Sequence, residues 1–251
     1  MNIIAVGQSD VGRVREHNED AHLVSNDLGL YVVADGMGGH LGGQTASSLA
    51  VQTVEETVAQ FAPQIEDGAG VMPLESSPVP RLLADAVRAA CGAIFDVAQN
   101  DPDLLGMGTT VTALVVKSGR AFIAHVGDSR CYLQRKGRII QITDDHSLVN
   151  EQIKAGLITR EQARQSRLKN IITRSVGFEK DVAVDTFALP VQAGDRLLMC
   201  SDGLANFVDD TEIGLALATL RLEEVPAAMI DLANERGGDD NITVVCVATA
   251  E

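Results

Sequence analysis

Along the chain, apolar residues follow a strand-like period in some segments and a helical period in others. The predicted strands are residues 2–8, 21–25, 29–34, 109–117, 120–127, 130–135, 138–143, 181–188, 195–201 and 241–249. The predicted helices, in which apolar residues recur every three or four positions, are residues 43–61, 81–99, 209–220 and 223–236. The last helix should end at Gly237-Gly238, a common signal for a helix C-terminus. Because the strands occur in groups with pairs of helices between them, we expect an α+β sandwich rather than a βαβ series.

Three segments between these elements carry predictions of their own. Short spacers separate the four strands between residues 109 and 143, which predicts antiparallel hairpins, because a parallel crossover needs about a dozen residues or more. The segment 62–80 is rich in Pro, Gly, Ser and acidic residues and predicts a surface loop between two helices. The segment 144–180 is polar and basic, and a capping box at Thr159-Arg160-Glu161-Gln162 predicts a short helix within it. This segment is either a flap that faces a substrate or a solvated helical hairpin.

Composition and charge narrow the class of protein. At 251 residues and 45% hydrophobic composition, the chain can bury the core of one large domain. The net charge of −15 opposes nonspecific binding to nucleic acid or anionic membranes, but not a phosphate-handling site that holds divalent cations. No apolar run approaches the roughly 18–20 residues that span a bilayer, and no signal peptide is recognisable, so a cytoplasmic location is expected. The cysteines lack the paired spacing of metal ligands and should be small buried hydrophobes in a reducing compartment: Cys91, Cys131, Cys200 and Cys246.

Aspartates stand at the ends of the predicted strands, usually beside a glycine. They are Asp35, Asp128, Asp202 and Asp240, with Asp20 directly before the strand at 21–25. One such aspartate is an ordinary turn residue, but several carboxylates at the rims of buried strands predict convergence on a divalent metal site. Oxygen ligands without a cysteine cluster select Mg²⁺, Mn²⁺ or Ca²⁺, and the lack of EF-hand spacing disfavours a calcium loop. Dispersed carboxylates suit a binuclear site that activates a water molecule.

Two basic residues stand close to these aspartates in the sequence. Arg15 lies five residues before Asp20, and a guanidinium can hold two phosphate oxygens at once. His40 follows the glycine turn after Asp35 and could protonate a leaving oxygen, although a hydrogen-bonded loop histidine is an equally good interpretation. His125 lies within an apolar strand pattern and is expected to be a core residue.

Seven short motifs occur in a fixed order from residue 7 to residue 247. They are Arg15-x-x-Asn18-Glu19-Asp20, Val33-Ala34-Asp35-Gly36-Met37-Gly38-Gly39-His40, Gly108-Thr109-Thr110, Val126-Gly127-Asp128-Ser129-Arg130, Asp145-His146-Ser147, Cys200-Ser201-Asp202-Gly203-Leu204 and Gly237-Gly238-x-Asp240-Asn241-x-Thr243. Together they resemble the bacterial metal-dependent protein phosphatases of the PPM family, type 2C. The resemblance implies a four-layer α-β-β-α sandwich with two antiparallel sheets. It also implies a single domain over residues 1–251, with a variable flap at about 144–180.

The same resemblance implies a set of metal ligands. Asp35 would bridge two Mn²⁺ or Mg²⁺ ions, and the Gly36 carbonyl, Asp202 and Asp240 would complete the protein ligands. Asp128, with Asp202, would match a third, weaker metal site. No ligand position departs from the family pattern, which disfavours an inactive relative.

The resemblance assigns the remaining motif residues to supporting or substrate-facing roles. Glu19 and Asp20 would act through metal-bound waters or from outside the ligand set. Arg15 would hold the substrate phosphate, and His40 would be the general acid.

We therefore expect a phosphoric monoester hydrolase, namely a metal-dependent phosphatase for phosphoserine and phosphothreonine in proteins. A hydroxide held by both metals would attack phosphorus in line, and the enzyme would oppose bacterial Ser/Thr kinases. Its expected partners are phosphorylated proteins, including such a kinase, with no nucleic acid and no membrane, and the expected state is a monomer. Two alternatives stay open: a binding module that keeps the metals as a sensor or scaffold, and an enzyme for another phosphomonoester.

Overall fold

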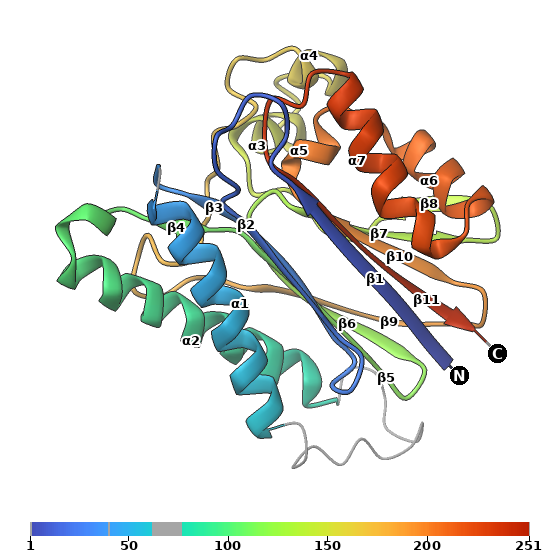
Figure 1. The fold of residues 1–251 in the computed structure, drawn as a ribbon, viewed down its shortest axis with the longest axis horizontal. Coiled ribbons are helices and arrows are strands. Elements are labelled where there is room, and N and C mark those ends of the chain that lie inside the picture. The colour runs from blue at the N-terminus through green and yellow to red at the C-terminus, as the bar shows by residue number, and fades with distance from the viewer. Residues whose placement is uncertain (1, 40, 62–76, 251) are drawn as a thin grey trace.

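Two antiparallel sheets packed face to face form the centre of the protein, as seen in a computed structural model that describes residues 2–39, 41–61 and 77–250 (Figure 1). The first sheet has, in spatial order, β1 (Asn2–Asp10), β11 (Ile242–Ala250), β10 (Arg196–Cys200), β7 (Arg130–Arg135) and β8 (Arg138–Gln141). The second has β2 (Asp20–Ser25), β3 (Leu30–Met37), β5 (Val111–Lys117), β6 (Arg120–Val126) and β9 (Asp185–Pro190), with β4 (Gly108–Thr109) paired to β3.

Helices cover the outer face of each sheet. The second sheet is covered by α1 (Leu41–Phe61) and α2 (Val79–Asn100), and the first by α5 (Asp202–Ala205), α6 (Asp210–Thr219) and α7 (Val225–Glu235) (Figure 1). Two short helices, α3 (Leu148–Lys154) and α4 (Arg160–Arg164), lie between β8 and β9 in the chain, and single 3₁₀ turns occupy η3 (Pro102–Leu104) and η4 (Leu222–Glu224). The predicted α+β fold class, a four-layer α-β-β-α sandwich, is confirmed.

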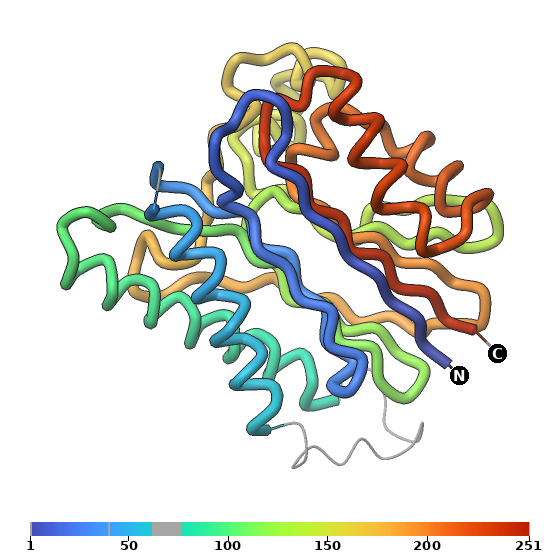
Figure 2. The backbone as a smooth tube through the Cα atoms, viewed as in Figure 1, coloured from blue at the N-terminus to red at the C-terminus, as the bar shows by residue number. Residues whose placement is uncertain are grey.

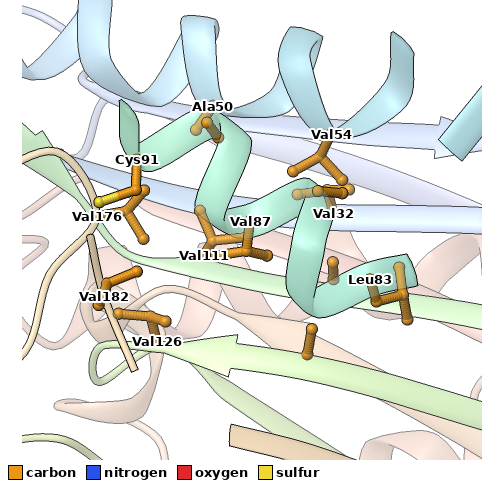
Figure 3. Close-up of a cluster of buried hydrophobic side chains, with 14 of the residues drawn as sticks. Val32, Ala50, Val54, Leu83, Val87, Cys91, Val111, Val126, Val176 and Val182 are labelled. Carbon is orange, nitrogen blue, oxygen red and sulfur yellow. The ribbon is translucent and has the colours of Figure 1, made fainter. Parts of the chain in front are cut away.

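The apolar run of β3 shows why the strands read as continuous hydrophobic segments. Leu30 and Val32 face the helices, where Val32 packs in one core cluster with Val54 of α1 and Leu83 of α2 (Figure 3). Tyr31 and Val33 point the other way, into the core between the two sheets. Both faces of the strand are therefore buried, and no alternation of apolar and polar residues remains to be seen in the sequence.

The two ends of the chain lie together at one end of the sandwich. β1 and β11 are antiparallel neighbours, with Asn2 opposite Ala250. The backbone trace shows that the loop from β1 to β2 lies at the other end of the sandwich (Figure 2). The aspartates of the predicted site stand at that end too.

Most predicted elements match the observed ones, with two kinds of difference. α3 and α5 were not predicted, because each is too short to display a helical period. β9 begins at Asp185 rather than at residue 181, because the residues just before it pack against α2 and do not pair with a strand. Val182 is buried in the core beside that helix, and the Lys180 ammonium lies 3.9 Å from the Asp96 carboxylate of α2.

The predicted series of hairpins is correct for β5–β6 and β7–β8 but wrong for the connection between β6 and β7, and the predicted strand 109–117 is divided into β4 and β5. β4 pairs with β3, and β6 and β7 belong to different sheets. The turn after β6 needs the left-handed conformation of Gly127 (φ 112°), and a Cβ there would collide with Thr110. This crossing places Asp128 between the two sheets, and a hairpin would not have done so.

Several local predictions can also be checked. The capping box is present, with the Thr159 hydroxyl accepting from the Gln162 amide at 3.2 Å, and α7 ends before Gly237 and Gly238, both with positive φ. All four cysteines are reduced and buried, as expected. Of the predicted loop 62–80, residues 62–76 lie outside the described residues, and Val79 already belongs to α2.

Candidate metal and phosphate site

The five aspartates predicted to gather come from both sheets. Asp20 begins β2 and lies opposite Asp35 in the register of β3. Asp202 begins α5 directly after β10, and Asp240 directly precedes β11, the neighbour of β10. Asp128 lies in the crossing from β6 to β7 and is only 6% exposed. Because the sheets pack face to face, these strand ends meet at one end of the sandwich.

Burial and mutual repulsion raise the pKa of four of these carboxyls. Burial is the largest cause for Asp20, whose pKa rises to about 7, with the charges of Asp202 and Asp240 adding to it. Burial and then the charge of Asp240 raise the pKa of Asp202 to about 6. Burial, followed by the charges of neighbouring aspartates, holds the pKa of Asp35 and of Asp128 well above the usual range. The cluster is therefore poised to accept positive charge.

Two oxygens of this cluster have no hydrogen-bond partner among the described residues. The Asp20 carboxylate accepts hydrogen bonds at one oxygen only, Oδ2, from Ser201 Oγ at 2.8 Å and Thr243 Oγ1 at 2.6 Å. Its Oδ1 is buried and unpartnered, and so is Oδ1 of Asp128. A buried unpaired carboxylate oxygen is costly, and hard divalent cations such as Mg²⁺ and Mn²⁺ prefer oxygen donors. The residues present fit such ions.

Protein side chains alone do not form a complete ligand cage. Within residues 2–39, 41–61 and 77–250, no three acidic, histidine or cysteine side chains converge tightly enough to hold an ion by themselves. The charges of Asp20 and Asp202 nevertheless contribute to the raised pKa of Asp35, so these aspartates lie within electrostatic reach of one another. Both observations agree with a Mg²⁺-type site, which keeps several waters and takes few protein ligands.

Arg15 stands at the rim of the cluster, in the loop between β1 and β2. Its Nη2 donates to Asp240 Oδ2 at 2.8 Å, while 53% of its side chain remains exposed. Asn241 holds this loop in place, because its side chain donates to the carbonyls of Val11 and His17 and accepts from the Glu19 amide. The guanidinium thus has donors left for an anion that approaches from solvent.

Gly36 and Glu19 lie where β3 meets the start of α1. The Gly36 amide donates to the Glu19 carbonyl at 3.2 Å, and Ser47 Oγ donates to the same carbonyl at 2.6 Å. A Cβ at Gly36 would collide with the carbonyl oxygens of Gly43 and Glu19, and a Cβ at Gly43 would collide with the Glu19 carboxylate. Only glycines allow this close approach of strand, helix and carboxylate.

The crossing that carries Asp128 is tied to the segment after β8. Arg130 forms a bidentate ion pair with Asp145, with Nη2 to Oδ2 at 2.7 Å and Nε to Oδ1 at 3.0 Å. The Gly127 amide donates to His146 Nδ1 at 3.0 Å, and the His146 amide donates back to the Gly127 carbonyl at 2.8 Å. These contacts fix the position of the Asp128 backbone.

The two histidines singled out in the sequence have different outcomes. His40 lies outside the described residues, so its role as a general acid stays a prediction. His125 is fully buried, as expected, and its Nδ1 lies 3.0 Å from Thr112 Oγ1. Burial lowers the pKa of His125 to about 4, so it is neutral at physiological pH.

Reasoning from the residues did not assign roles to four polar side chains that support the cluster. They are Ser201, Thr243, Asn241 and Asp145. The signal was present, because all four stand within the short motifs that also contain the aspartates. A hydroxyl or amide in a motif does not reveal its partner until the strands are placed.

No described helix is both long and apolar enough to cross a membrane.

Comparison with known proteins agrees with this geometry. The family model for Protein phosphatase 2C matches residues 9–242. The Serine/threonine phosphatase stp of Listeria welshimeri is 39% identical over 244 residues, which are 96% of this chain and 93% of that protein. The crystal structure of the Mycobacterium tuberculosis serine/threonine phosphatase PstP/Ppp aligns with a TM-score of 0.86 at 36% identity and covers 99% of both chains. The catalytic domain of PstP in complex with two manganese ions aligns with a TM-score of 0.85, at 36% identity and 99% coverage of each chain.

The sequence match and the structural match each span nearly the whole chain, and the motif aspartates lie together at one end of the sandwich. The predicted family and fold are both confirmed, and with them the predicted phosphatase class. This chain belongs to the protein phosphatase 2C family.

Proposed function

We propose that this protein is a Mn²⁺- or Mg²⁺-dependent phosphatase that removes phosphate from phosphoserine and phosphothreonine in other proteins. The observation that supports this most is the gathering of buried carboxyls, Asp20, Asp35, Asp128 and Asp202, with raised pKa values. A divalent cation would favour their ionised forms and so remove the cost of burying them. The manganese-bound relative supports the same cofactor here.

Asp35, Asp202, Asp240 and the carbonyl of Gly36 would hold two such ions. When bound, paired divalent ions generate a nucleophile from water and neutralise the charge of a phosphoryl group. The protein supplies the shape around them: Ser201 and Thr243 hold the Asp20 carboxylate at Oδ2 and leave its buried Oδ1 without a hydrogen bond. Asp20 and Glu19 would act from outside the ligand set, and Asp128 with Asp202 would contribute a third, weaker site.

Arg15 would bind and orient the substrate phosphate. Its exposed guanidinium carries five N–H donors and uses Nη2 for Asp240. The pairing with Asp240 sets the guanidinium beside a proposed metal ligand, so its remaining N–H donors would be available to a phosphate at the metal site. His40 would deliver a proton to the leaving oxygen.

The proposed reaction transfers the phosphoryl group directly to water, without a covalent phosphoenzyme. All four cysteines are buried, and burial raises the pKa of Cys131 to about 12. Burial also raises the pKa of Cys200 and of Cys246. None of these three is a thiolate at physiological pH, so none is an available nucleophile.

The wider setting of the enzyme is also part of the proposal. The segment 144–180 would form a flap within a single domain, because α3 and α4 lie beside the end of the sandwich that holds the aspartates. Phosphorylated proteins, a Ser/Thr kinase among them, would be its substrates, and it would act as a monomer. A cytoplasmic location fits the four reduced cysteines.

Metal-dependent phosphate release tests the proposed function. Purified protein incubated with Mn²⁺ and a phosphothreonine peptide should release phosphate, and a chelator should stop the release. Asp202→Ala should lower turnover by more than the roughly 100-fold expected for losing a residue that only supports a ligand. Asp231→Ala, a change at an exposed position of α7, is the matched control and should keep wild-type turnover. Mn²⁺ binding without phosphate release from any peptide would contradict the enzyme and favour a binding module.

A further inference from the structure

A cleft of about 690 Å³ extends from the aspartate cluster along the segment between β8 and β9. Asp128 and Asp202 line its inner end, and residues of α3, α4 and α6 line its walls. In Figure 1, α3, α4 and α5 lie at the end of the molecule away from the termini, and α6 lies beside β8 and α7. A polypeptide that presents a phosphorylated side chain to the cluster would have room to lie in this cleft.

Three cations that line the cleft have no partner carboxylate. The side chains of Arg160, Arg164 and Lys169 make no ion pair or hydrogen bond with any residue in the described part of the chain. The other two cations of the lining are already paired, Arg130 with Asp145 and Arg236 with Glu212. No carboxylate forms an ion pair with these three cations, and the carboxylates within electrostatic reach of them are Glu161, beside Arg160 and Arg164, and Asp202, near Lys169.

Five of the seven acidic residues of the lining, in contrast, already have partners, and the other two, Asp128 and Asp202, belong to the aspartate cluster. Asp145 and Glu212 are in the ion pairs just described, and Asp144 lies 3.1 Å from the Lys154 ammonium. Asp210 accepts a hydrogen bond from the Tyr132 hydroxyl at 3.1 Å, and Asp209 caps α6. The side chains that remain available to an anionic ligand are Arg160, Arg164 and Lys169, which we call the positive wall.

Lys169 connects this wall to the aspartate cluster. Its positive charge opposes the rise in the pKa of Asp202 that burial and Asp240 cause, so it lies within electrostatic reach of that carboxyl. Its ammonium also lies 6.0 Å from the centroid of the Phe207 ring, in the turn after α5. Arg160 and Arg164 are exposed on α4 and continue the positive charge outward.

We propose that this cleft binds the part of a phosphoprotein next to the phosphorylated residue and selects anionic side chains there, either carboxylates or a second phosphate. Arg160, Arg164 and Lys169 are the residues that determine this specificity. The inference rests on the proposed phosphatase function. A chain with a net charge of −15 repels acidic segments at long range, so a local positive wall is required if such segments are to bind.

Three phosphothreonine peptides test the preference. One has neutral flanking residues, one has Asp and Glu on both sides, and one carries a second phosphothreonine in place of these acids. With Mn²⁺ at low ionic strength, we expect kcat/KM to be on the order of fivefold higher for the anionic peptides, since each exposed ion pair contributes only modestly. The advantage should shrink as salt is added, because salt screens exposed charges. The two anionic peptides distinguish carboxylate from phosphate as the preferred group.

Three variants make the test specific: a double change, a single control change and a triple change. Arg160→Gln/Arg164→Gln should weaken the preference while leaving turnover of the neutral peptide and of para-nitrophenyl phosphate unchanged. Arg167→Gln is the matched control, because Arg167 is an exposed arginine of the same segment that does not line the cleft. Lys169→Gln, combined with the first pair, should remove any preference that remains.

The outcomes separate this inference from the function on which it rests. Equal kcat/KM for all three peptides in the wild type, or a preference that survives the triple change, would overturn the specificity proposal while leaving the phosphatase intact. A preference that Arg167→Gln removes as well would also overturn it, because the general charge of the segment would then be the cause. No phosphate release from any peptide or from the aryl phosphate would overturn the phosphatase itself.

Discussion

Changing Asp20 to asparagine removes one negative charge from the centre of the aspartate cluster and preserves the shape of the side chain. Asp20 Oδ2 accepts from Ser201 Oγ and Thr243 Oγ1, and the amide oxygen of asparagine can accept both hydrogen bonds. The buried Oδ1, which has no partner, is replaced by an NH₂ group that also lacks one. The main difference between the two proteins is therefore the charge.

The effect of this charge on stability depends on pH in a defined direction. Asp20 has a pKa of about 7 in the folded protein, whereas the pKa of an aspartate exposed to water, as in the unfolded chain, is 3.8. Below about pH 4 the carboxyl is protonated in both the folded and the unfolded chain, and no penalty applies. Between pH 4 and pH 7 unfolding releases the proton, so stability falls as the pH rises, and above pH 7 the full loss persists.

The magnitude follows from the size of the pKa rise. A change from 3.8 to about 7 corresponds to roughly 4 kcal/mol of lost stability in the metal-free protein. About 2–3 kcal/mol of this loss falls between pH 5 and pH 8. In chelator, the free energy of unfolding of Asp20→Asn relative to that of the wild type should therefore rise by about 2–3 kcal/mol between pH 5 and pH 8. Mn²⁺ should narrow the gap, because a divalent cation favours the ionised carboxylate of the wild type.

Urea unfolding followed by circular dichroism at pH 5, 6, 7 and 8, with chelator and with Mn²⁺, measures this difference. Asp27→Asn is the matched control: Asp27 is exposed in the turn between β2 and β3, at the other end of the strand that begins with Asp20. If Asp20→Asn kept the same pH dependence as the wild type in chelator, the charge of Asp20 would not be the source of the penalty, and the account of the cluster would be wrong.

Two further changes test the rim and the tight packing of the site. Arg15→Ala should raise KM for a phosphopeptide by about tenfold, because a hydrogen bond to a charged group is lost. Its Mn²⁺ affinity, measured by calorimetry, should stay nearly unchanged, and a loss of Mn²⁺ binding would instead show that Arg15 is structural. Gly36→Ala should lower the free energy of unfolding by on the order of 2–3 kcal/mol, since the new methyl collides with the backbone of Gly43 and Glu19. Gly92→Ala, in the middle of α2 with open space around it, should instead stabilise the protein by up to about 1 kcal/mol in the same urea titration.

The order of the elements could be read from the sequence because local signals are strong there. Periodicity located α1 and α2 to within two residues at each end, and the glycine pair after α7 marked its end. The hairpin rule failed between β6 and β7, because a short spacer is equally compatible with a crossing from one packed sheet to another. Only the packing of the sheets decides between the two, and at this point it is decided by the turn at Gly127.

The amino-acid sequence by itself determined which residues carry the chemistry: acidic side chains at strand ends, an arginine ahead of them and a basic segment in an acidic chain. These are properties of residue type and spacing, which survive without coordinates. The tertiary structure alone decided how they act together. The packing that brings β10 and β11 beside Asp20 depends on contacts between distant residues, since Asp20 bonds to Ser201 and Thr243, which lie 181 and 223 positions away. The register that sets Asp20 opposite Asp35, and the cleft in which Arg160 and Arg164 lack a paired carboxylate, also exist only in the folded chain. Charge repulsion, burial and unpaired cations exist only once such distant segments meet, which is why no local pattern could predict them.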